Sequence, residues 1–388
     1  MKPVIHFLGD HCTSCIKCVK SCPTEAISII NGKVVIDDAH CIHCHVCVQS
    51  CQHKQLRIRE VNLEKAFQQH EYNIALIPTS ILSDFQKFDE LKDFVYAIKE
   101  FHFDEVVQYS DIEGQLYQQA LQDSLNSSQV MLTSFCPTIN RLIKQEYPTL
   151  IDHLLPYDYP VEIAAKRLRE KYKGKDIGIF SLCECVGKLT LAKEPLGKMD
   201  SQIDYALSIS RMFPHFNKRK GKGKEEMIIN ADGIKSNVSD LFGDHRLSVM
   251  SVEGLSQIRM VLDLIEFDQL KHIQLIALYH CYQGCIGGYY LWNNPFEGRF
   301  RIESMVSQCD APAVALKHNE YFKKRRVNEQ KQTFKERMAW FHKVNAILET
   351  LPQYDCGSCG FANCRSLAMR IASGEVDDSL CRVKKKVK

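Results

Sequence analysis

Short apolar runs alternate with amphipathic stretches through the middle of the chain. The runs that have the length and composition of buried strands lie at 74–77, 105–109, 130–133, 176–181 and 273–279. Apolar residues recur at helical spacing over 88–101, 114–125 and 162–173, and the polar stretch 61–72 also reads as a linking helix. Strands that alternate with helices predict an α/β domain.

Three of these apolar runs lead into cysteine. The residues concerned are Cys136 after the third run, Cys183 and Cys185 after the fourth, and Cys281 and Cys285 after the fifth. Sites in α/β sheets gather beyond the carboxyl ends of the strands. Thiolates are the ligands of iron–sulfur clusters, and the glycine pair 287–288 lets the backbone approach a bulky ligand closely. The pattern predicts one site that collects cysteines from several strands.

The N-terminal segment 1–60 contains one cysteine pattern twice. Cys12 begins a C-x2-C-x2-C-x3-C-P run, and a second run with the same cysteine spacing begins at Cys41. This is the bacterial two-cluster ferredoxin spacing, in which the fourth cysteine of each run ligates the other cluster. The predicted ligand sets are Cys12, Cys15, Cys18 and Cys51 for one [4Fe–4S] cluster, and Cys41, Cys44, Cys47 and Cys22 for the other. Zinc held by paired C-x-x-C units is the alternative, but these spacings favour iron and sulfide.

Two details of the second run depart from the first. Gln52 follows the last cysteine where the first run has a proline, and we expect this to alter a turn rather than the ligation. His43 and His45 lie inside the run, where they could tune a cluster by hydrogen bonding. We expect instead that both are solvated loop residues.

A third cysteine group has the spacing C-x2-C-x4-C-x16-C and follows a polar, helix-like stretch at 317–350. Four thiolates around glycines, with a helix between the third and fourth, predict a one-cluster module. Its ligands would be Cys356, Cys359, Cys364 and Cys381. A zinc knuckle is the alternative, and the lack of histidine in the pattern favours a third [4Fe–4S] site.

The amino-acid composition limits the class of protein and the partners that fit the chain. The 388 residues are 45% hydrophobic and 25% charged, typical of a globular protein, and the net charge of +3 gives no argument for nucleic acid. No apolar run is long enough to span a membrane, and the N-terminal stretch lacks the apolar core of a secretory signal. Eighteen cysteines with C-x-x-C spacing predict metal binding in a reducing cytoplasm.

The strand-end motifs, in this order, resemble those of the catalytic domain of [FeFe]-hydrogenases. The family motifs T-S-C-C-P, M-P-C-x-x-K and C-x-x-G-C-x-x-G-G correspond to 133–137, 183–188 and 281–288, the last with one residue fewer before the glycines. The resemblance covers about 72–315, and the cysteine-rich flanks resemble those of the sensory members. It implies a multidomain α+β and α/β chain with a two-cluster ferredoxin domain at 1–60, a hydrogenase large-subunit-like domain at 61–316, and a linker helix with a small helical 4Fe–4S domain at 317–388.

The resemblance also implies roles for single residues. Lys188 would donate a hydrogen bond to a cyanide of a diiron subsite, and Pro78 would line the same pocket. A hydrogenase-type [4Fe–4S] cluster would be held by Cys136, Cys185, Cys281 and Cys285, the last of which would also bridge to the diiron subsite.

Two positions depart from the family's proton path. Phe135 stands where catalytic members have the relay cysteine, and Leu191 stands where they have the relay glutamate. Pocket methionines of the family fall at Cys183 and Tyr279. General acid–base chemistry needs a titratable group within hydrogen-bond reach, so we expect weak hydrogen turnover or none. Cys183 and Cys309 are expected to be structural, although Cys183 is a candidate spare ligand.

Three functions stay open at this point: a sensory or regulatory hydrogenase-like protein, an electron-transfer protein with four clusters and no diiron site, and a cluster-assembly factor. In each, the expected partner is a redox protein or a downstream regulatory protein, with no nucleic acid and no membrane. The sequence gives no oligomeric state.

Overall fold

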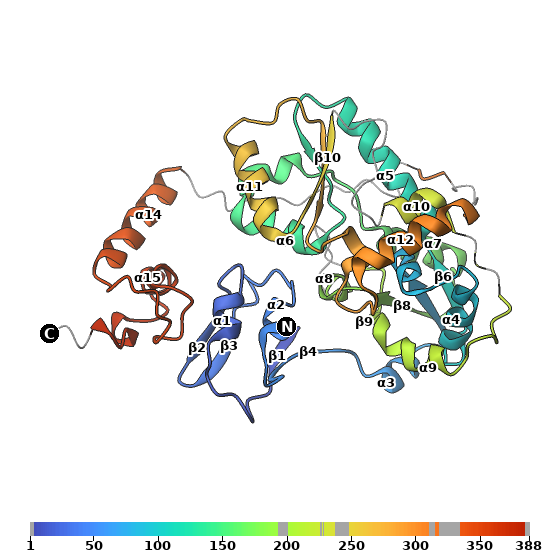
Figure 1. The fold of residues 1–388 in the computed structure, drawn as a ribbon, viewed down its shortest axis with the longest axis horizontal. Coiled ribbons are helices and arrows are strands. Elements are labelled where there is room, and N and C mark those ends of the chain that lie inside the picture. Colours follow the sequence, from blue (N-terminus) through green and yellow to red (C-terminus); the bar gives the residue numbers. More distant parts are fainter. Residues whose placement is uncertain are drawn as a thin grey trace. The chain divides into compact units, whose positions relative to one another are not determined.

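The computed structural model describes residues 4–192, 201–225, 227, 229–236, 248–309, 315–317 and 334–384. The chain forms two compact units (Figure 1). One unit combines Met1–Arg59 with Val327–Lys388, and the other comprises Glu60–Arg326. Each unit has hydrophobic clusters of its own.

The N-terminal part of the first unit consists of two small antiparallel sheets and two short helices. Strand β1 (Ile5–Phe7) pairs with β4 (Leu56–Ile58), and β2 (Ile27–Ile30) pairs with β3 (Lys33–Ile36). Helices α1 (Lys17–Ser21) and α2 (Val46–Ser50) each begin within a cysteine run. Apolar side chains such as Ile5, Val19 and Ile27 form the core between them.

The sequence repeat of this part is also a repeat of backbone conformation. Non-glycine residues rarely adopt positive φ, yet three pairs of equivalent positions in the two halves of the repeat do so. They are Ser14 and His43 (φ 53° and 55°), Ile16 and His45 (53° and 62°), and Glu25 and Lys54 (53° and 51°). Both cysteine runs therefore fold into the same tight loop.

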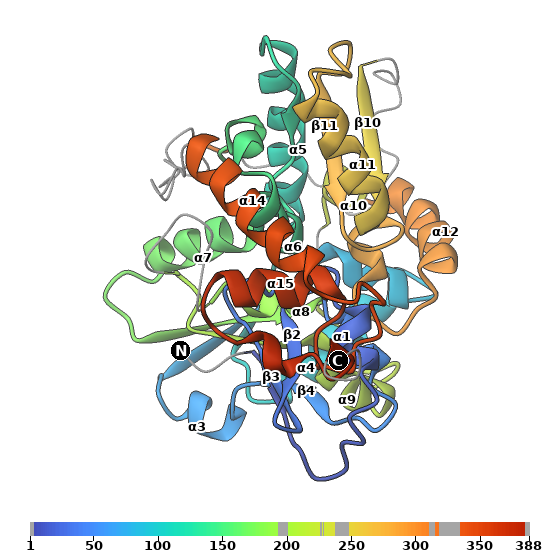
Figure 2. The same ribbon diagram turned by 90° about the vertical axis from the view of Figure 1, so that its left-hand side faces the viewer.

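The C-terminal part of the first unit contains α14 (Phe334–Glu349), α15 (Cys364–Ala372) and the 3₁₀ turn η7 (Asp378–Leu380). Helix α15 is the predicted helix between the third and fourth cysteines. Asn363 caps it by accepting the backbone N–H of Ser366 at 2.7 Å. Helices α14 and α15 pack together through a cluster that includes Val344 and Leu367 (Figure 2). Much of the predicted helix-like stretch 317–350 lies outside the described residues.

The second unit is built on two parallel sheets, as the alternation of strands and helices predicts. The strand orders are β6-β5-β8-β9 and β10-β11-β7. The strands are β5 (Tyr72–Ile77), β6 (Glu105–Gln108), β7 (Met131–Leu132), β8 (Ile177–Cys183), β9 (Tyr205–Ser208), β10 (Val249–Glu253) and β11 (Leu275–Tyr279). All five predicted strands are present; β9 and β10 were not predicted, because their apolar runs are short and mixed with polar residues.

The helices of this unit are α3 (Leu63–Phe67), α4 (Glu90–Lys99), α5 (Ser110–Leu125), α6 (Pro137–Glu146), α7 (Pro160–Lys171), α8 (Val186–Leu189), α9 (Phe213–Asn217), α10 (Ala231–Lys235), α11 (Leu255–Glu266) and α12 (Pro295–Met305). The 3₁₀ segments are η1 (Thr79–Asp84), η2 (Pro148–His153), η3 (Ile209–Met212), η5 (Gly284–Gly287) and η6 (Val306–Gln308). Helix α5 begins earlier than predicted because the Gln108 side chain accepts the Ser110 N–H at 2.6 Å. The linking helix predicted for 61–72 is confined to α3.

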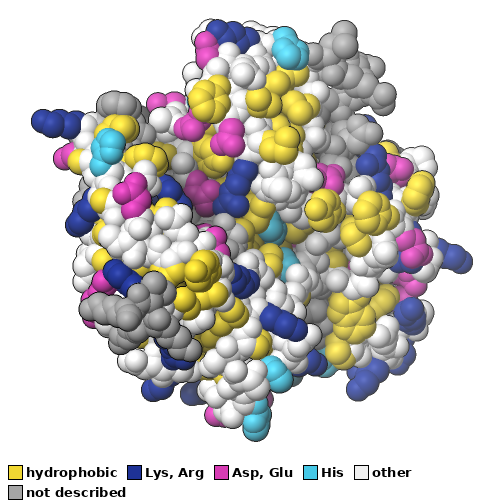
Figure 3. All heavy atoms as spheres, turned by 60° about the vertical axis from the view of Figure 1, so that its left-hand side comes forward, with side chains coloured by type: hydrophobic (Ala, Val, Ile, Leu, Met, Phe, Trp, Pro, Cys, Tyr) yellow, Lys and Arg dark blue, Asp and Glu magenta, His cyan; other side chains and the backbone are white. Residues whose placement is uncertain are grey.

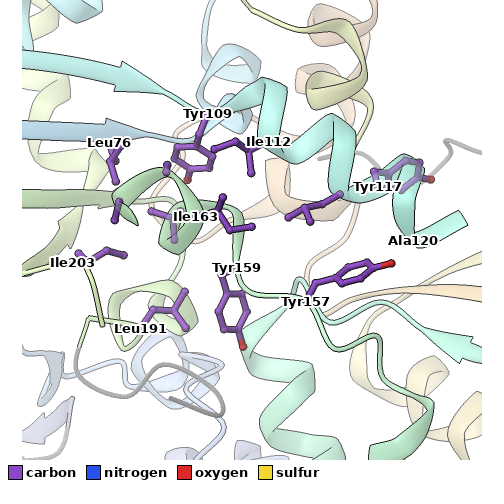
Figure 4. Packing of buried hydrophobic residues seen from close by; sticks show 14 of the residues in the cluster. Leu76, Tyr109, Ile112, Tyr117, Ala120, Tyr157, Tyr159, Ile163, Leu191 and Ile203 are labelled. Carbon is purple, nitrogen blue, oxygen red and sulfur yellow. The ribbon is translucent and has the colours of Figure 1, made fainter. Parts of the chain in front are cut away.

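One buried cluster joins the two sheets. It contains Ile74 and Leu76 of β5 together with Leu275 and Ala277 of β11. Figure 4 shows Leu76, Tyr109, Ile112, Ile163 and Leu191 within it. Burying each of these large apolar side chains contributes roughly 1.5–3 kcal/mol, so the cluster fixes how the carboxyl ends of the two sheets face each other.

Candidate metal centres

The two ferredoxin-like cysteine sets each line a cavity of the first unit. One cavity is lined by Cys12, Cys15, Cys18 and Cys51. The other is lined by Cys22, Cys41, Cys44 and Cys47. The structure thus brings together the sets that the spacing predicts, with the fourth cysteine of each run in the other run's cavity. We call them the first and second cavities.

The walls of both cavities are largely apolar. Ile16, Ile29 and Leu56 line the first cavity with its thiols. Burial raises the pKa of Cys18 to about 11 and that of Cys41 to about 12. Iron ligation deprotonates a thiol outright, and a backbone donor is in place for one sulfur: the Gln55 N–H donates to Cys51 Sγ at 3.2 Å. These residues fit a cluster.

His43 and His45 are buried rather than solvated, with exposures of 2% and 8%. The positive φ at both residues turns the loop so that the imidazoles lie inside the fold. His45 lines the second cavity, and His43 Nε2 lies 3.5 Å from the Asp38 carboxylate. The expectation of solvated loop histidines is wrong, and the position of His45 suits hydrogen bonding near a cluster.

A third cavity is lined by Cys356, Cys359, Cys364 and Cys381. Cys381 is buried, whereas Cys356 is exposed. The Ser358 hydroxyl lies 3.2 Å from Cys356 Sγ, and this hydrogen bond lowers the pKa of the thiol. In the described part of the chain, no group of three or more His, Cys, Asp or Glu side chains is placed to hold a single metal ion.

The central cysteines of the second unit come from the ends of strands in both sheets. Cys136 follows β7 and Cys185 follows β8, while Cys281 and Cys285 follow β11. These thiols raise one another's pKa: Cys136 and Cys285 act on Cys281, and Cys281 and Cys136 act on Cys185. The structure therefore places the four predicted ligands within electrostatic reach of one another. We call this group the central thiols.

Local structure explains the position of the first central thiol. Cys136 is the residue before α6, and Pro137 starts that helix. The backbone N–H groups of Thr138, Ile139 and His280 act to lower the pKa of its thiol. Burial nevertheless raises the pKa of Cys136, and it raises that of Cys285 to about 12. The central thiols keep some accessible surface, but the protein around them removes most of their hydration.

A buried ion pair accompanies the central thiols. The Lys188 ammonium pairs with the Glu184 carboxylate, and the two side chains are 12% and 1% exposed. Burial by itself lowers the pKa of Lys188, but the negative charges around the ammonium, of which Glu184 is the strongest, together outweigh burial and hold the pKa well above its usual value. Glu184 Oε2 has no hydrogen-bond partner among the described residues. Lys188 was predicted from its motif but Glu184 was not, although an acidic residue between two cysteines at a strand end was a signal in the sequence.

Pro78 is buried at the end of β5, directly before η1. The next residue, Thr79, donates a hydrogen bond to the buried carboxylate of Glu113. The charge of Glu113 acts on Cys285. The end of β5 thus lies near the central thiols, and Glu113 is a second acidic residue there that the sequence analysis did not identify.

The departures from the family motifs pack into the hydrophobic core. Leu191 is 2% exposed and belongs to the large buried cluster (Figure 4). Phe135 packs against the same cluster, with its ring stacked on Tyr157 at 6.4 Å between centroids. Cys183 is buried, its sulfur 3.3 Å from Ser181 Oγ, and the Cys309 thiol donates to the Met305 carbonyl at 3.3 Å.

Family models match three parts of the chain. The model of the iron-only hydrogenase large subunit, C-terminal domain, matches residues 73–222. A 4Fe–4S dicluster domain matches 5–52, and a putative Fe–S cluster domain matches 351–383. The chain is a hydrogenase-like iron–sulfur protein. It combines an N-terminal 4Fe–4S ferredoxin domain with a hydrogenase-like α/β fold.

Solved structures similar to this hydrogenase-like chain include two [FeFe]-hydrogenases. A HydA structure that describes stepwise H-cluster assembly has 15% sequence identity and a TM-score of 0.47, covering 62% of this chain and 88% of that chain. A variant of HydA1 from Chlamydomonas reinhardtii has 13% identity and a TM-score of 0.48, covering 68% of this chain and 98% of that chain. The search of curated proteins found no match.

The apolar length of the helices and the surface charge of the hydrogenase-like chain bear on the membranes or partners that it could contact. No helix in the described ranges is long and apolar enough to cross a membrane. Basic and acidic side chains are interspersed over the face shown in Figure 3, in keeping with the net charge of +3.

Proposed function

We propose that the hydrogenase-like chain holds four [4Fe–4S] clusters and passes electrons, or the redox state that they carry, to a partner protein, with weak hydrogen turnover or none. The observation that carries this proposal is the grouping of sixteen cysteines into four sets of four. Three sets each line a cavity of their own. The fourth set is the central thiols.

The chain's own residues supply what such clusters need. When bound, a [4Fe–4S] cluster carries one electron at a time, at a potential set by burial and by hydrogen bonds to its sulfurs. The central thiols are half-buried, and the N–H groups around Cys136 act to lower the pKa of its thiol. The apolar walls of the first cavity exclude water from the thiols that they surround.

The weak-turnover part of the proposal rests on positions 135 and 191. A proton relay needs groups that can bind and release a proton. Phe135 and Leu191 cannot do so, and both pack against the hydrophobic core rather than against polar groups. Glu113 and Glu184 are acidic, but Glu113 is held by Thr79 and Glu184 by Lys188.

Iron analysis tests the first part of this proposal. Anaerobically reconstituted protein should contain about 16 iron atoms per chain, four per cluster. Cys285→Ala and Cys359→Ala should each lower the content by about four, and Cys309→Ala, which alters a cysteine outside the four sets, should leave it unchanged. Zinc in place of iron, or an unchanged iron content in Cys285→Ala, would contradict the ligand assignment.

Infrared spectroscopy separates the proposal from its strongest rival, a sensory protein that binds a diiron subsite. Lys188 favours the rival, because its ammonium lies near Cys285 and has three donors, of which Glu184 need take only one. The protein would be exposed to hydrogenase maturation factors without oxygen. Carbonyl and cyanide bands would establish the diiron subsite and make a sensory hydrogenase the better description. Four clusters without such bands would leave an electron-transfer protein.

The partner is proposed to be a redox protein or a downstream regulatory protein. The presence of several clusters supports this proposal, because a series of one-electron centres transfers electrons only between a donor and an acceptor. Pull-down of the reduced and oxidised protein from anaerobic lysate, followed by electron transfer between the purified components, would identify it.

A further inference from the structure

We infer that the C-terminal module (residues 334–384) is docked on the first half of the ferredoxin repeat, so that the third cavity exchanges electrons with the first cavity and not directly with the second. This inference rests on the proposed function, because it requires clusters in these cavities. Three groups of contacts within the first unit support it.

The first contact is a backbone pairing. The Ile29 N–H in β2 donates to the Gly360 carbonyl at 2.8 Å. Gly360 has φ +88°, and a Cβ added there would lie 2.0 Å from the Ile29 carbonyl oxygen, so only glycine allows this approach. Gly360 directly follows the ligand Cys359, whereas Ile29 lines the first cavity.

The second contact joins the two cavity walls directly. Gly357 lines the third cavity, and Ile16 lines the first. A Cβ added at Gly357 would lie 2.7 Å from Ile16 Cδ1, so the two residues touch. Lys20 of α1 holds the loop in place by donating to the Asp355 carbonyl at 2.5 Å. A single residue from each part therefore separates the two cavities.

The third group of contacts clamps α15 to the ferredoxin part. The Glu25 carboxylate accepts hydrogen bonds from Asn363 Nδ2, at 2.6 Å, and from Ser366 Oγ. Next to Asn363, Ala362 packs into the buried cluster of the ferredoxin part. Arg370 adds an ion pair of 2.8 Å with Asp37, which stands at the start of the second half, four residues before Cys41. Figures 1 and 2 show α15 beside this part of the chain.

Differences between the two halves of the repeat explain why the C-terminal module docks mainly on the first half. When the two cysteine runs are aligned, Lys54 stands where the first half has Glu25, and His45 stands where it has Ile16. The second half therefore lacks both the acceptor for Asn363 and the apolar wall residue. The route from the third cavity to the second needs one more residue. Asn363 lines the third cavity and donates to Glu25, but Glu25 does not line the second cavity, whereas the next residue along the route, Thr24, does.

With clusters bound, the transfer would be a simple one-electron step. One cluster would lose an electron and the other would gain it, with no bond made or broken and no proton moved. The first electron comes from a low-potential reductant, which is dithionite in the experiment below. Because tunnelling falls steeply with distance, the contact between Gly357 and Ile16 favours exchange between the third and first cavities.

Electron paramagnetic resonance of the dithionite-reduced protein tests the pairing. Two nearby reduced clusters broaden each other's signals by spin–spin interaction. Cys15→Ala, which removes a ligand of the first cavity, should sharpen the signal of the C-terminal cluster. Cys44→Ala, which removes a ligand of the second, should leave its broadening in place. The opposite pattern, or no broadening in the unmodified protein, would overturn the inference.

A second measurement tests the docking without relying on the clusters. Glu25→Lys should disrupt the clamp and raise hydrogen–deuterium exchange at the Ile29 amide at least tenfold, because its partner is the Gly360 carbonyl. Lys54→Glu, at the equivalent position of the second half, is the matched control and should not change that exchange. Equal protection in both variants would refute the docking. Iron analysis of the unmodified protein distinguishes failure of the proposed function from failure of this inference. An iron content below four clusters would contradict the proposed function. Four clusters without spin–spin broadening would contradict only this inference.

Discussion

Replacing Glu184 by Gln should destabilise the second unit much more than loss of an ordinary ion pair. Glu184 is 1% exposed and its partner Lys188 is 12% exposed. Glu184→Gln removes the negative charge that pairs directly with the buried ammonium of Lys188. Breaking a buried pair in this way typically costs about 3–5 kcal/mol of the free energy of unfolding. With roughly 2–4 °C per kcal/mol for a unit of this size, the melting temperature should fall by about 6 °C or more.

The matched control is an exposed pair. Lys271 and Asp268 also form an ion pair, but their side chains are 69% and 81% exposed. Exposed pairs contribute about 0–1 kcal/mol, so Asp268→Asn should lower the melting temperature by a few degrees at most. The double variant Glu184→Gln, Lys188→Met should lose about 2 kcal/mol less free energy of unfolding than the sum of the two single variants, because neither charge is then left without its partner.

Anaerobic differential scanning calorimetry measures these values, with iron content determined on the same samples. Matching iron contents show that the loss of stability comes from the ion pair and not from loss of a cluster. If Glu184→Gln lowers the melting temperature no more than Asp268→Asn does, the pair is not buried as the structure describes. Strict additivity of Glu184→Gln and Lys188→Met would show that the two side chains do not interact.

Three further predictions concern the central thiols. Cys285→Ala should abolish one cluster signal in electron paramagnetic resonance and leave the ferredoxin signals intact; loss of all the signals would instead indicate global misfolding. Gly287→Ala should have the same effect, because the new Cβ would lie 2.2 Å from the backbone oxygen of Tyr282, and an iron content equal to that of the unmodified protein would contradict this. Phe135→Cys combined with Leu191→Glu should raise hydrogen evolution at least tenfold after maturation, if the missing relay groups are what limits turnover; an unchanged rate in protein with infrared carbonyl bands would show that they are not.

Much of the iron–sulfur architecture is local and could be read from the sequence. Cysteines as closely spaced as Cys12, Cys15 and Cys18 lie near one another in any compact loop, so spacing alone predicts that they share a site. The positions of the strand-end cysteines could also be predicted, because each follows closely on an apolar run that forms a buried strand. The buried strands β5, β8 and β11 follow from the same apolar runs.

Other features depend on segments that are far apart in the sequence. The central thiols come from both sheets, which the sequence pattern did not predict, and the shared hydrophobic core sets how the strand ends meet. Glu184 became recognisable only through its burial beside Lys188.

The sequence by itself determined which cysteines group together, because ligand spacing is a short-range property of the chain. The tertiary structure decided the environment of each group: the burial of His43 and His45, the ion pair near Cys285, and the contact of Gly360 with Ile29. These contacts depend on shape and on close backbone approach between segments from distant parts of the chain, which no local pattern encodes. Such long-range packing fixes which thiol sets are neighbours.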